Sequence, residues 1–180
     1  METYSSLLRR IYSSGEPRNI FSLLVTGGGF QTIQQLLTVP GASNSVIHAD
    51  LPYSMSSLRE QINEVPDSYC SSETSQKLAR TAFEKCIQHQ LSDDQRLSTL
   101  CSANVFGVGC TASLVSSRPK RGPHRCYVSV YSTSACVSYM LDMEKGLRSR
   151  EEEDDLCSRL VMDAIAPPCG VAAGMLSGIS

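Results

Sequence analysis

Three consecutive glycines are the first feature of this sequence that could do chemistry. The tetrapeptide Thr26-Gly27-Gly28-Gly29 follows an apolar run at 19–25 and precedes a helical pattern at 32–37. Bare glycine backbone lets a ligand approach closely, and the N–H groups at the start of a helix attract anions. The loop lacks both the dinucleotide fingerprint G-x-G-x-x-G and the Walker lysine. Its spacing therefore leaves two interpretations open, a phosphate or carboxylate site and a plain tight turn.

The densest positive charge of the chain lies in the segment from Arg118 to Arg125. It reads Arg-Pro-Lys-Arg-Gly-Pro-His-Arg, and its two prolines and one glycine exclude a regular helix. We therefore expect a basic loop, which is either a solvated connection between strands or a flap that reads a phosphate over a pocket. A nucleic-acid patch is disfavoured because no aromatic residues interleave with the charges.

No nucleophile can be paired with a base from the sequence. The histidines His48, His89 and His124 share no local motif with a serine, cysteine or threonine, so no catalytic residue can be nominated. The eight cysteines never form a C-x-x-C pair, which argues against a zinc site. We expect small, reduced, mostly buried thiols, no metal and no cofactor. The acidic run at 151–155 suits the positive end of a helix dipole better than a metal site.

Length and composition predict one domain without a strongly charged partner. The chain has 180 residues and a formal net charge of -2, which gives no global attraction to nucleic acid or acidic membranes. No stretch approaches the roughly 20 apolar residues of a membrane-spanning helix, and residues 1–11 lack a signal-peptide core. We expect a cytoplasmic protein with one domain at 1–169 and a flexible tail at 170–180. A homo-oligomer remains open.

Hydrophobic periodicity predicts helices that alternate with short strands. The expected helices lie at 4–12, at 32–37 with Ile33, Leu36 and Leu37 inward, around 58–62, at 71–90 after the cap Ser71, and from 149 onward. The expected strands lie at 19–25, around 46–47, at 103–108, and at 126–131 and 135–141 as a hairpin. This pattern is typical of an α/β fold, a three-layer α/β/α sandwich with one mixed sheet.

The order of these pieces resembles the CinA C-terminal domain family, which includes bacterial nicotinamide-nucleotide amidases. The resemblance covers about residues 4 to 166 and rests on five segments that stand where the family reads E-S-C-T-G-G, V-P-G-S-S, Y-S-N-x-x-K, G-x-V-S-x-E and G-D-R-E. In this chain they read Leu23-Leu24-Val25-Thr26-Gly27-Gly28, Val39-Pro40-Gly41-Ala42-Ser43, Tyr53-Ser54-Met55-Ser56-Ser57-Leu58, Cys70-Ser71-Ser72-Glu73 and Ser149-Arg150-Glu151. The segment from Gly107 to Ser113 falls where the family has a V-T-G-I-A-G-P loop, and together with the basic loop it looks like a divergent eukaryotic branch.

The resemblance implies a family member that is degenerate as an amidase. The serine nucleophile of the family aligns with Leu24 and its lysine with Leu58, and a leucine can neither attack a carbonyl nor move a proton. What remains implies a binding pocket for a nucleotide or another phosphate-bearing molecule, made by Thr26, Gly27, Gly28, Gly29, Tyr53 and Arg150. The alternative is a nicotinamide mononucleotide amidohydrolase with a displaced nucleophile such as Ser22, Thr26 or Ser54.

Overall fold

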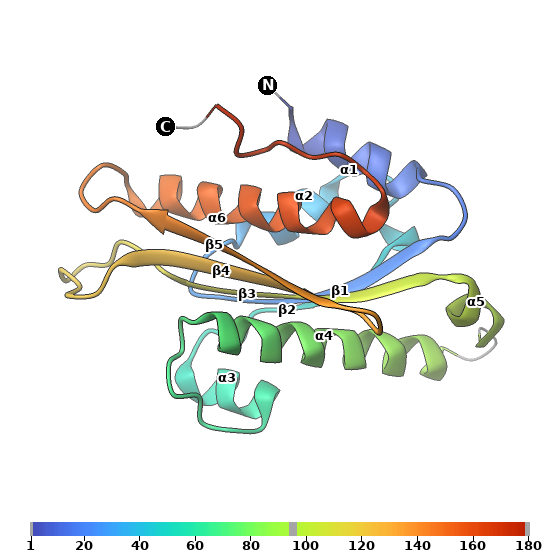
Figure 1. The fold of residues 1–180 in the computed structure, drawn as a ribbon, viewed down its shortest axis with the longest axis horizontal. Coiled ribbons are helices and arrows are strands. Elements are labelled where there is room, and N and C mark those ends of the chain that lie inside the picture. Colours follow the sequence, from blue (N-terminus) through green and yellow to red (C-terminus); the bar gives the residue numbers. More distant parts are fainter. Residues whose placement is uncertain (1, 94–96, 179–180) are drawn as a thin grey trace.

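The five strands form one mixed sheet in the order β2-β1-β3-β4-β5 (Figure 1). The computed structural model describes residues 2–93 and 97–178. The strands are β1 (Asn19–Thr26), β2 (Val46–Asp50), β3 (Asn104–Ser113), β4 (His124–Tyr131) and β5 (Cys136–Met143). Strands β2, β1 and β3 are parallel, whereas β4 and β5 are antiparallel to their neighbours. The carboxyl ends of the three parallel strands therefore meet at one end of the sheet.

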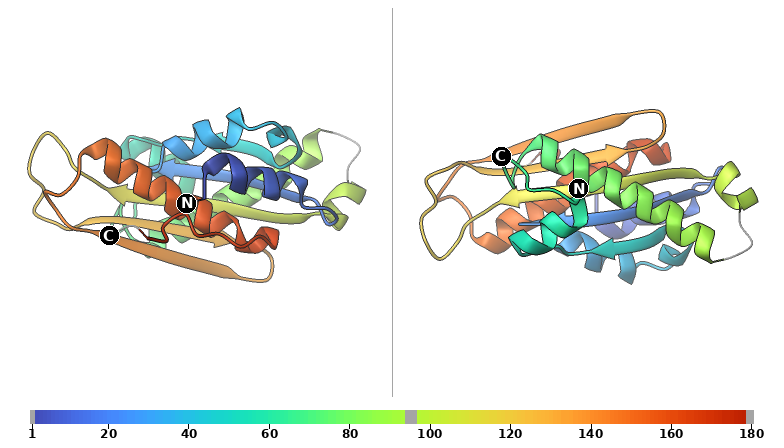
Figure 2. Two further views of the ribbon diagram at one scale, coloured as in Figure 1. Left: turned by 90° about the horizontal axis from the view of Figure 1, so that it is seen from above. Right: turned by 90° about the horizontal axis from the view of Figure 1, so that it is seen from below.

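Helices cover both faces of the sheet and give the expected three layers. One layer holds α1 (Tyr4–Ser13), α2 (Gln31–Thr38) and α6 (Arg150–Ile165), and the other holds α3 (Met55–Ile62) and α4 (Ser72–Ser92) (Figures 1 and 2). A short helix, α5 (Leu97–Ser102), precedes β3, and the 3-10 turns Ala42–Asn44 and Pro167–Cys169 complete the elements. The predicted α/β/α sandwich with one mixed sheet is confirmed.

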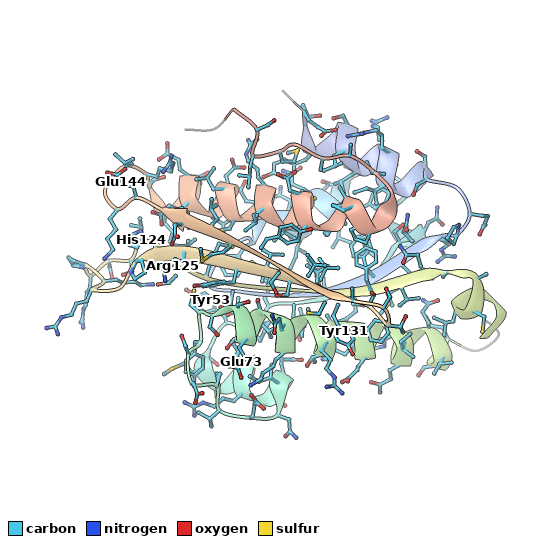
Figure 3. The ribbon with its side chains drawn as sticks, viewed as in Figure 1. Tyr53, Glu73, His124, Arg125, Tyr131 and Glu144 are labelled. Carbon is cyan, nitrogen blue, oxygen red and sulfur yellow. The ribbon has the colours of Figure 1, made fainter. Side chains whose placement is uncertain are left out.

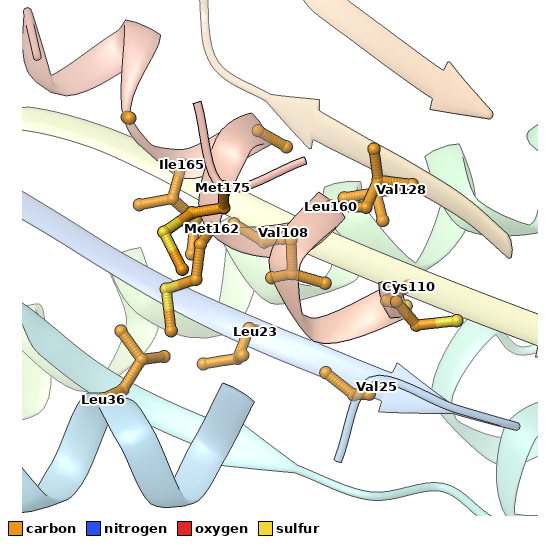
Figure 4. Packing of buried hydrophobic residues seen from close by; sticks show 14 of the residues in the cluster. Leu23, Val25, Leu36, Val108, Cys110, Val128, Leu160, Met162, Ile165 and Met175 are labelled. Carbon is orange, nitrogen blue, oxygen red and sulfur yellow. The ribbon is translucent and has the colours of Figure 1, made fainter. Parts of the chain in front are cut away.

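The main core lies between the sheet and the layer of α1, α2 and α6. Apolar side chains of β1, β3 and β4 meet Leu36 of α2 and the buried face of α6 there (Figure 4). The rings of Phe21 and Phe106 stack with centroids 5.0 Å apart. Every residue of β1 is buried, because a central parallel strand is covered on both faces. This explains why the first strand of the sequence reads as an apolar run that only Ser22 interrupts between Ile20 and Val25.

The second layer lies closer to the sheet, because two glycines of β3 face α4. A Cβ atom added to Gly107 would fall far inside van der Waals contact of the Ala79 carbonyl oxygen, and one added to Gly109 would meet the Ser75 carbonyl oxygen in the same way. The main chain of α4 therefore rests directly on β3. The segment 107–113, which the resemblance places where the family has a loop, continues the strand predicted at 103–108 and pairs with β1 on one side and β4 on the other.

The predicted helix cap at Ser71 is confirmed. Ser71 caps α4 by accepting a hydrogen bond from the Thr74 N–H, and Ser149 and Glu152 form a capping box at the start of α6. The prediction that Leu37 points inward was wrong, because this residue is 56% exposed. The eight-residue α2 instead buries Thr32 and Leu36.

The described part of the expected flexible tail, residues 170–178, packs against the domain. Met175 is 1% exposed, and its N–H donates to Asp163 Oδ1 at 2.7 Å. The Leu176 N–H donates to the other oxygen of Asp163 at 3.1 Å. The tail is held because a carboxylate on α6 satisfies its backbone donors.

No helix within residues 2–93 and 97–178 is both long and apolar enough to cross a lipid bilayer. In the same ranges, no three side chains among histidine, cysteine, aspartate and glutamate come together as a metal site.

Candidate functional site

A cavity of about 220 Å³ opens at the carboxyl ends of β1 and β3, where open α/β sheets usually place their ligands. Ten residues line it, and they include the predicted site residues Thr26, Gly27 and Tyr53. Leu58 and Tyr69 also line the cavity. We call this cavity the tyrosine pocket, and Figure 3 labels Tyr53, one of its lining residues. Three of the six predicted ligand-binding residues therefore lie together at this cavity.

The two tyrosines of the tyrosine pocket differ in how firmly they are held. The Tyr69 hydroxyl accepts a hydrogen bond from Arg59 Nε at 2.6 Å, and the Tyr69 carbonyl accepts one from Thr111 Oγ1 at 2.6 Å. Tyr53 is 68% exposed, and its ring lies 5.9 Å from that of Phe30. Tyr69 therefore forms a fixed wall, whereas Tyr53 presents an aromatic face to solvent.

The two leucines that stand in place of the serine and lysine lie in one apolar cluster. Leu24 is fully buried and Leu58 is 2% exposed, and both pack in a cluster with Leu78 and Ala82 of α4. Leu58 lines the tyrosine pocket, whereas Leu24 lies beneath it. Apolar packing has thus taken over the positions where the resemblance locates a reactive pair.

The N–H groups of the glycine loop point to a carboxylate of the chain itself. Asp154 of α6 accepts hydrogen bonds from Gly29 N at 2.7 Å, from Phe30 N at 3.1 Å and from Gln31 N at 3.3 Å. Asp154 is 8% exposed, so it caps α2 from within the protein. The expected anion site at Gly29 thus already holds an internal anion, and neither Gly28 nor Gly29 lines the tyrosine pocket.

Arg150 also bonds within the protein instead of pointing into the tyrosine pocket. Its two terminal nitrogens donate to the Val115 carbonyl at 2.7 Å and to the Gly27 carbonyl at 3.2 Å. It joins the loop after β1 to the loop after β3. Arg150 is therefore a positioning residue for the end of the sheet in this arrangement of the chain.

Solved structures share this architecture over nearly the whole chain. A competence/damage-inducible protein, CihA, from Agrobacterium tumefaciens covers 93% of this chain and 99% of its own, with a TM-score of 0.67 at 16% identity. The chain has the CinA fold. CinA superfamily proteins from Klebsiella pneumoniae and Escherichia coli match with TM-scores of 0.67 and 0.64, both at 10% identity, and cover 94% and 91% of this chain and 99% and 88% of their own. No family model and no curated protein matches the sequence itself.

Within this CinA fold, none of the three displaced hydroxyls has a base at hydrogen-bond distance among the described residues. Ser22 is fully buried, and its Oγ has no hydrogen-bond partner there. Ser54 Oγ caps α3 by accepting from the Ser57 N–H at 3.1 Å. Thr26 is 5% exposed and lines the tyrosine pocket without a recorded partner for its hydroxyl.

Sequence reasoning missed a polar group beneath α4 of the CinA fold. Ser22 on β1 lies in register with His48 on β2, and the buried Nε2 atom of His48 has no partner among the described residues. The His48 ring stacks on His89 with centroids 5.0 Å apart. Burial lowers the pKa of His48, and Lys85 and His89 lower it further. Neither Ser22 nor His48 lines the tyrosine pocket, so a substrate bound in that pocket would not reach them.

Two further carboxylates were read only as part of an acidic run. Glu153 is fully buried and Asp154 nearly so, and each bonds groups far away in sequence. Their sequence positions place both carboxylates on the inner side of α6, but the sequence does not show which groups they bond. A charged residue that replaces an apolar one on the inner face of a helix is the signal that could have found them.

Proposed function

We propose that this chain is a CinA-fold domain that binds a nicotinamide nucleotide or a similar phosphate-bearing molecule in the tyrosine pocket without hydrolysing it. The observation that carries the proposal is the burial of Leu24 and Leu58 in one apolar cluster. Amide hydrolysis by a serine needs a nucleophile and a group that takes its proton, and leucine supplies neither.

The remaining walls of the tyrosine pocket support the absence of hydrolysis. None of the described residues that line it is a lysine, histidine, aspartate or glutamate. A general base must lie within hydrogen-bond reach of the proton that it takes. The hydroxyls of Thr26 and Ser54 therefore have no activating group in the pocket.

Cys70 is the one thiol in the tyrosine pocket, and its environment disfavours nucleophilic attack. Burial, together with nearby Cys110 and Cys157, raises the pKa of the Cys70 thiol to about 11. The reactive form of cysteine is the thiolate, which at pH 7 amounts to about one molecule in ten thousand at such a pKa. A thiol of this kind does not replace an activated serine.

The size and lining of the tyrosine pocket favour a planar ring as the bound group. Its volume of about 220 Å³ is below the roughly 300 to 1,000 Å³ of most ligand sites, so it suits one ring better than a whole nucleotide. The exposed face of Tyr53 offers a surface on which such a ring can stack. Thr26, Ser54 and Thr111 are among the residues that line the same pocket with polar side chains.

The test measures binding and hydrolysis of nicotinamide mononucleotide separately. We expect calorimetric titration to detect binding, and no ammonia release above background. Tyr53→Ala should weaken binding on the order of tenfold, because an aromatic stacking contact of about 1 kcal/mol and its buried area are lost. Met140→Ala is the control, because Met140 is a large apolar residue on β5 that is 54% exposed.

Two results would contradict the proposal. Turnover of roughly one per second or faster would establish an amidase, and its loss in Ser22→Ala would identify the displaced nucleophile. Equal affinity of the native protein and Tyr53→Ala would remove the tyrosine pocket as the binding site.

A further inference from the structure

A second cavity of about 340 Å³ lies between the loop that joins β3 to β4 and the loop that joins β5 to α6. Its charged or titratable lining residues are Arg118, Lys120, His124, Lys145 and Arg148. We call it the basic pocket. It shares no lining residue with the tyrosine pocket, and Figure 3 shows His124 at the same end of the molecule as Glu144.

The described lining of the basic pocket carries basic side chains and no carboxylate. No aspartate or glutamate occurs among the described residues that line it, and Glu144, at the start of the second loop, is exposed and outside the lining. Some other cations of the chain are paired with carboxylates, as with Arg125 and Asp142 or Lys77 and Glu73. Among the described residues, Arg118, Lys120 and Lys145 have no such ion pair. Like charges held together repel, and an anion between them relieves that repulsion.

The loops hold these cations in place. Lys145 Nζ donates to the Lys120 carbonyl at 2.6 Å, which joins the two loops. Lys120 Nζ donates to Ser113 Oγ at 3.2 Å, which joins the first loop to the end of β3. The two lysines are therefore positioned by hydrogen bonds that leave further N–H donors for a ligand, because a lysine ammonium carries three.

The floor of the basic pocket is a buried histidine. His124 is 7% exposed, and its Nδ1 lies 2.7 Å from Glu153 Oε1. A carboxylate only accepts, so Nδ1 carries the proton. The other Glu153 oxygen accepts from Val115 N at 2.8 Å. The ring is thus fixed from behind, and its second nitrogen has no protein partner among the described residues.

We propose that the basic pocket binds a small molecule that carries two or more linked phosphate groups, either free diphosphate or the diphosphate end of a nucleotide. Several cations at one site match the several negative charges of a diphosphate better than the single group of a monophosphate. The guanidinium of Arg118 can donate two parallel hydrogen bonds to one phosphate. The inference does not depend on the function proposed for the tyrosine pocket, because the two sites share no residue.

Calorimetric titration with pyrophosphate, orthophosphate and adenosine diphosphate at about 0.15 M salt tests the proposal, since exposed charges are screened beyond about 8 Å under these conditions. We expect pyrophosphate to bind more tightly than orthophosphate. Tighter binding of adenosine diphosphate than of pyrophosphate would identify a nucleotide ligand, and equal or weaker binding would identify free diphosphate. Tyr53→Ala should leave pyrophosphate binding unchanged, so failure of one site does not imply failure of the other.

Matched variants decide whether the site is specific. Arg118→Ala and Lys120→Ala should each weaken pyrophosphate binding on the order of tenfold, because each removes a charge-assisted hydrogen bond. Arg121→Ala is the control, since it removes the same charge from the same loop but does not line the basic pocket. Equal losses in all three variants, or equal affinity in native protein and Arg118→Ala, would overturn the proposal. So would tighter binding of a single-stranded RNA than of pyrophosphate.

Discussion

The glycine loop and the basic pocket both gather hydrogen-bond donors near one end of the sheet, but only one of them carries its own anion. At the glycine loop, three backbone N–H groups bond the Asp154 carboxylate, and Arg150 bonds two main-chain carbonyls. At the basic pocket, lysine and arginine side chains line a cavity without a carboxylate among its described lining residues. Donor-rich sequence therefore indicates a ligand only where the fold leaves the donors without an internal partner.

This difference in internal partners changes which residues we expect to bind a phosphate. The loop of three glycines looks more like a known anion site than the segment 118–125 does. In the fold, its donors are satisfied within the protein, while the less regular segment keeps open donors. Two predictions test this contrast, and two others test the tyrosine pocket.

The largest effect is expected from Asp154→Ala, which removes the internal anion of the glycine loop. Three N–H groups lose their acceptor, so the free energy of unfolding should fall by about 3 to 5 kcal/mol. If the loop can hold an external anion, about 0.1 M phosphate should raise the melting temperature of the variant more than that of the native protein.

Asp163→Ala is the control for this variant, because Asp163 accepts from two N–H groups of the tail and none at a helix start. It should lose less stability and should show no extra response to phosphate. Equal phosphate responses in the two variants would mean that the glycine loop has no anion site of its own.

Leu24→Ser should cost about 2 to 4 kcal/mol of unfolding free energy. Leu24 is fully buried in the cluster with Leu58, so the change leaves a cavity and places a hydroxyl among apolar side chains. It should not produce hydrolysis of nicotinamide mononucleotide, because position 58 supplies no base. Chemical denaturation and an ammonia assay measure the two effects, and a stable variant that hydrolyses the substrate would contradict the apolar interpretation.

Cys70 should react slowly with alkylating reagents at neutral pH. Burial raises its pKa from 9.0 to about 11, which lowers the thiolate fraction at pH 7 about a hundredfold. The rate should rise about tenfold per pH unit until the pH approaches that pKa. Peptide mass spectrometry after a pulse of iodoacetamide can compare Cys70 with the exposed Cys101. Faster labelling of Cys70 at pH 7 would restore it as a candidate nucleophile.

The smallest effect is expected from Arg118→Gln in the absence of a ligand. Removing one of several neighbouring positive charges should leave the unfolding free energy unchanged or raise it by about 0.5 kcal/mol at low salt. Any gain should disappear at about 1 M salt, where charges are screened beyond about 3 Å. A clear loss of stability at low salt would show that Arg118 has a stabilising partner and would weaken the contrast with the glycine loop.

Elements with a strong local signal were predicted well from the sequence. The long helix after Ser71, the hairpin of β4 and β5, and the helix from 149 onward all follow from periodicity or from residues a few positions apart. The resemblance placed the segment 107–113 where the family has a loop, and the predicted strand ended at Val108. Gly107 and Gly109 are required by the close approach of α4, which only the folded chain reveals.

The candidate site was predictable only in part, for a related reason. Thr26, Gly27 and Tyr53 come together because parallel strands end at one edge of the sheet. Gly29 and Arg150 instead bond to groups of the protein itself. The partner of Gly29, Asp154, lies 125 residues away in the sequence. The same limit hid the contact between His124 and Glu153, which are 29 residues apart. Such pairs depend on how α6 packs against the sheet, and no local pattern encodes that.

The close seating of α4 on Gly107 and Gly109 has a consequence for recognition. Because a helix whose main chain rests in these gaps cannot rotate or slide without losing contact with β3, the segment that leads into it is rigid before any ligand arrives. Tyr69 and Cys70 belong to that segment and form one wall of the tyrosine pocket. A ligand that fits this wall needs no ordering of the protein, so little of its binding free energy is lost to entropy. The same rigidity gives the pocket little ability to adapt, and we expect it to reject ring systems only slightly larger than the one that it fits.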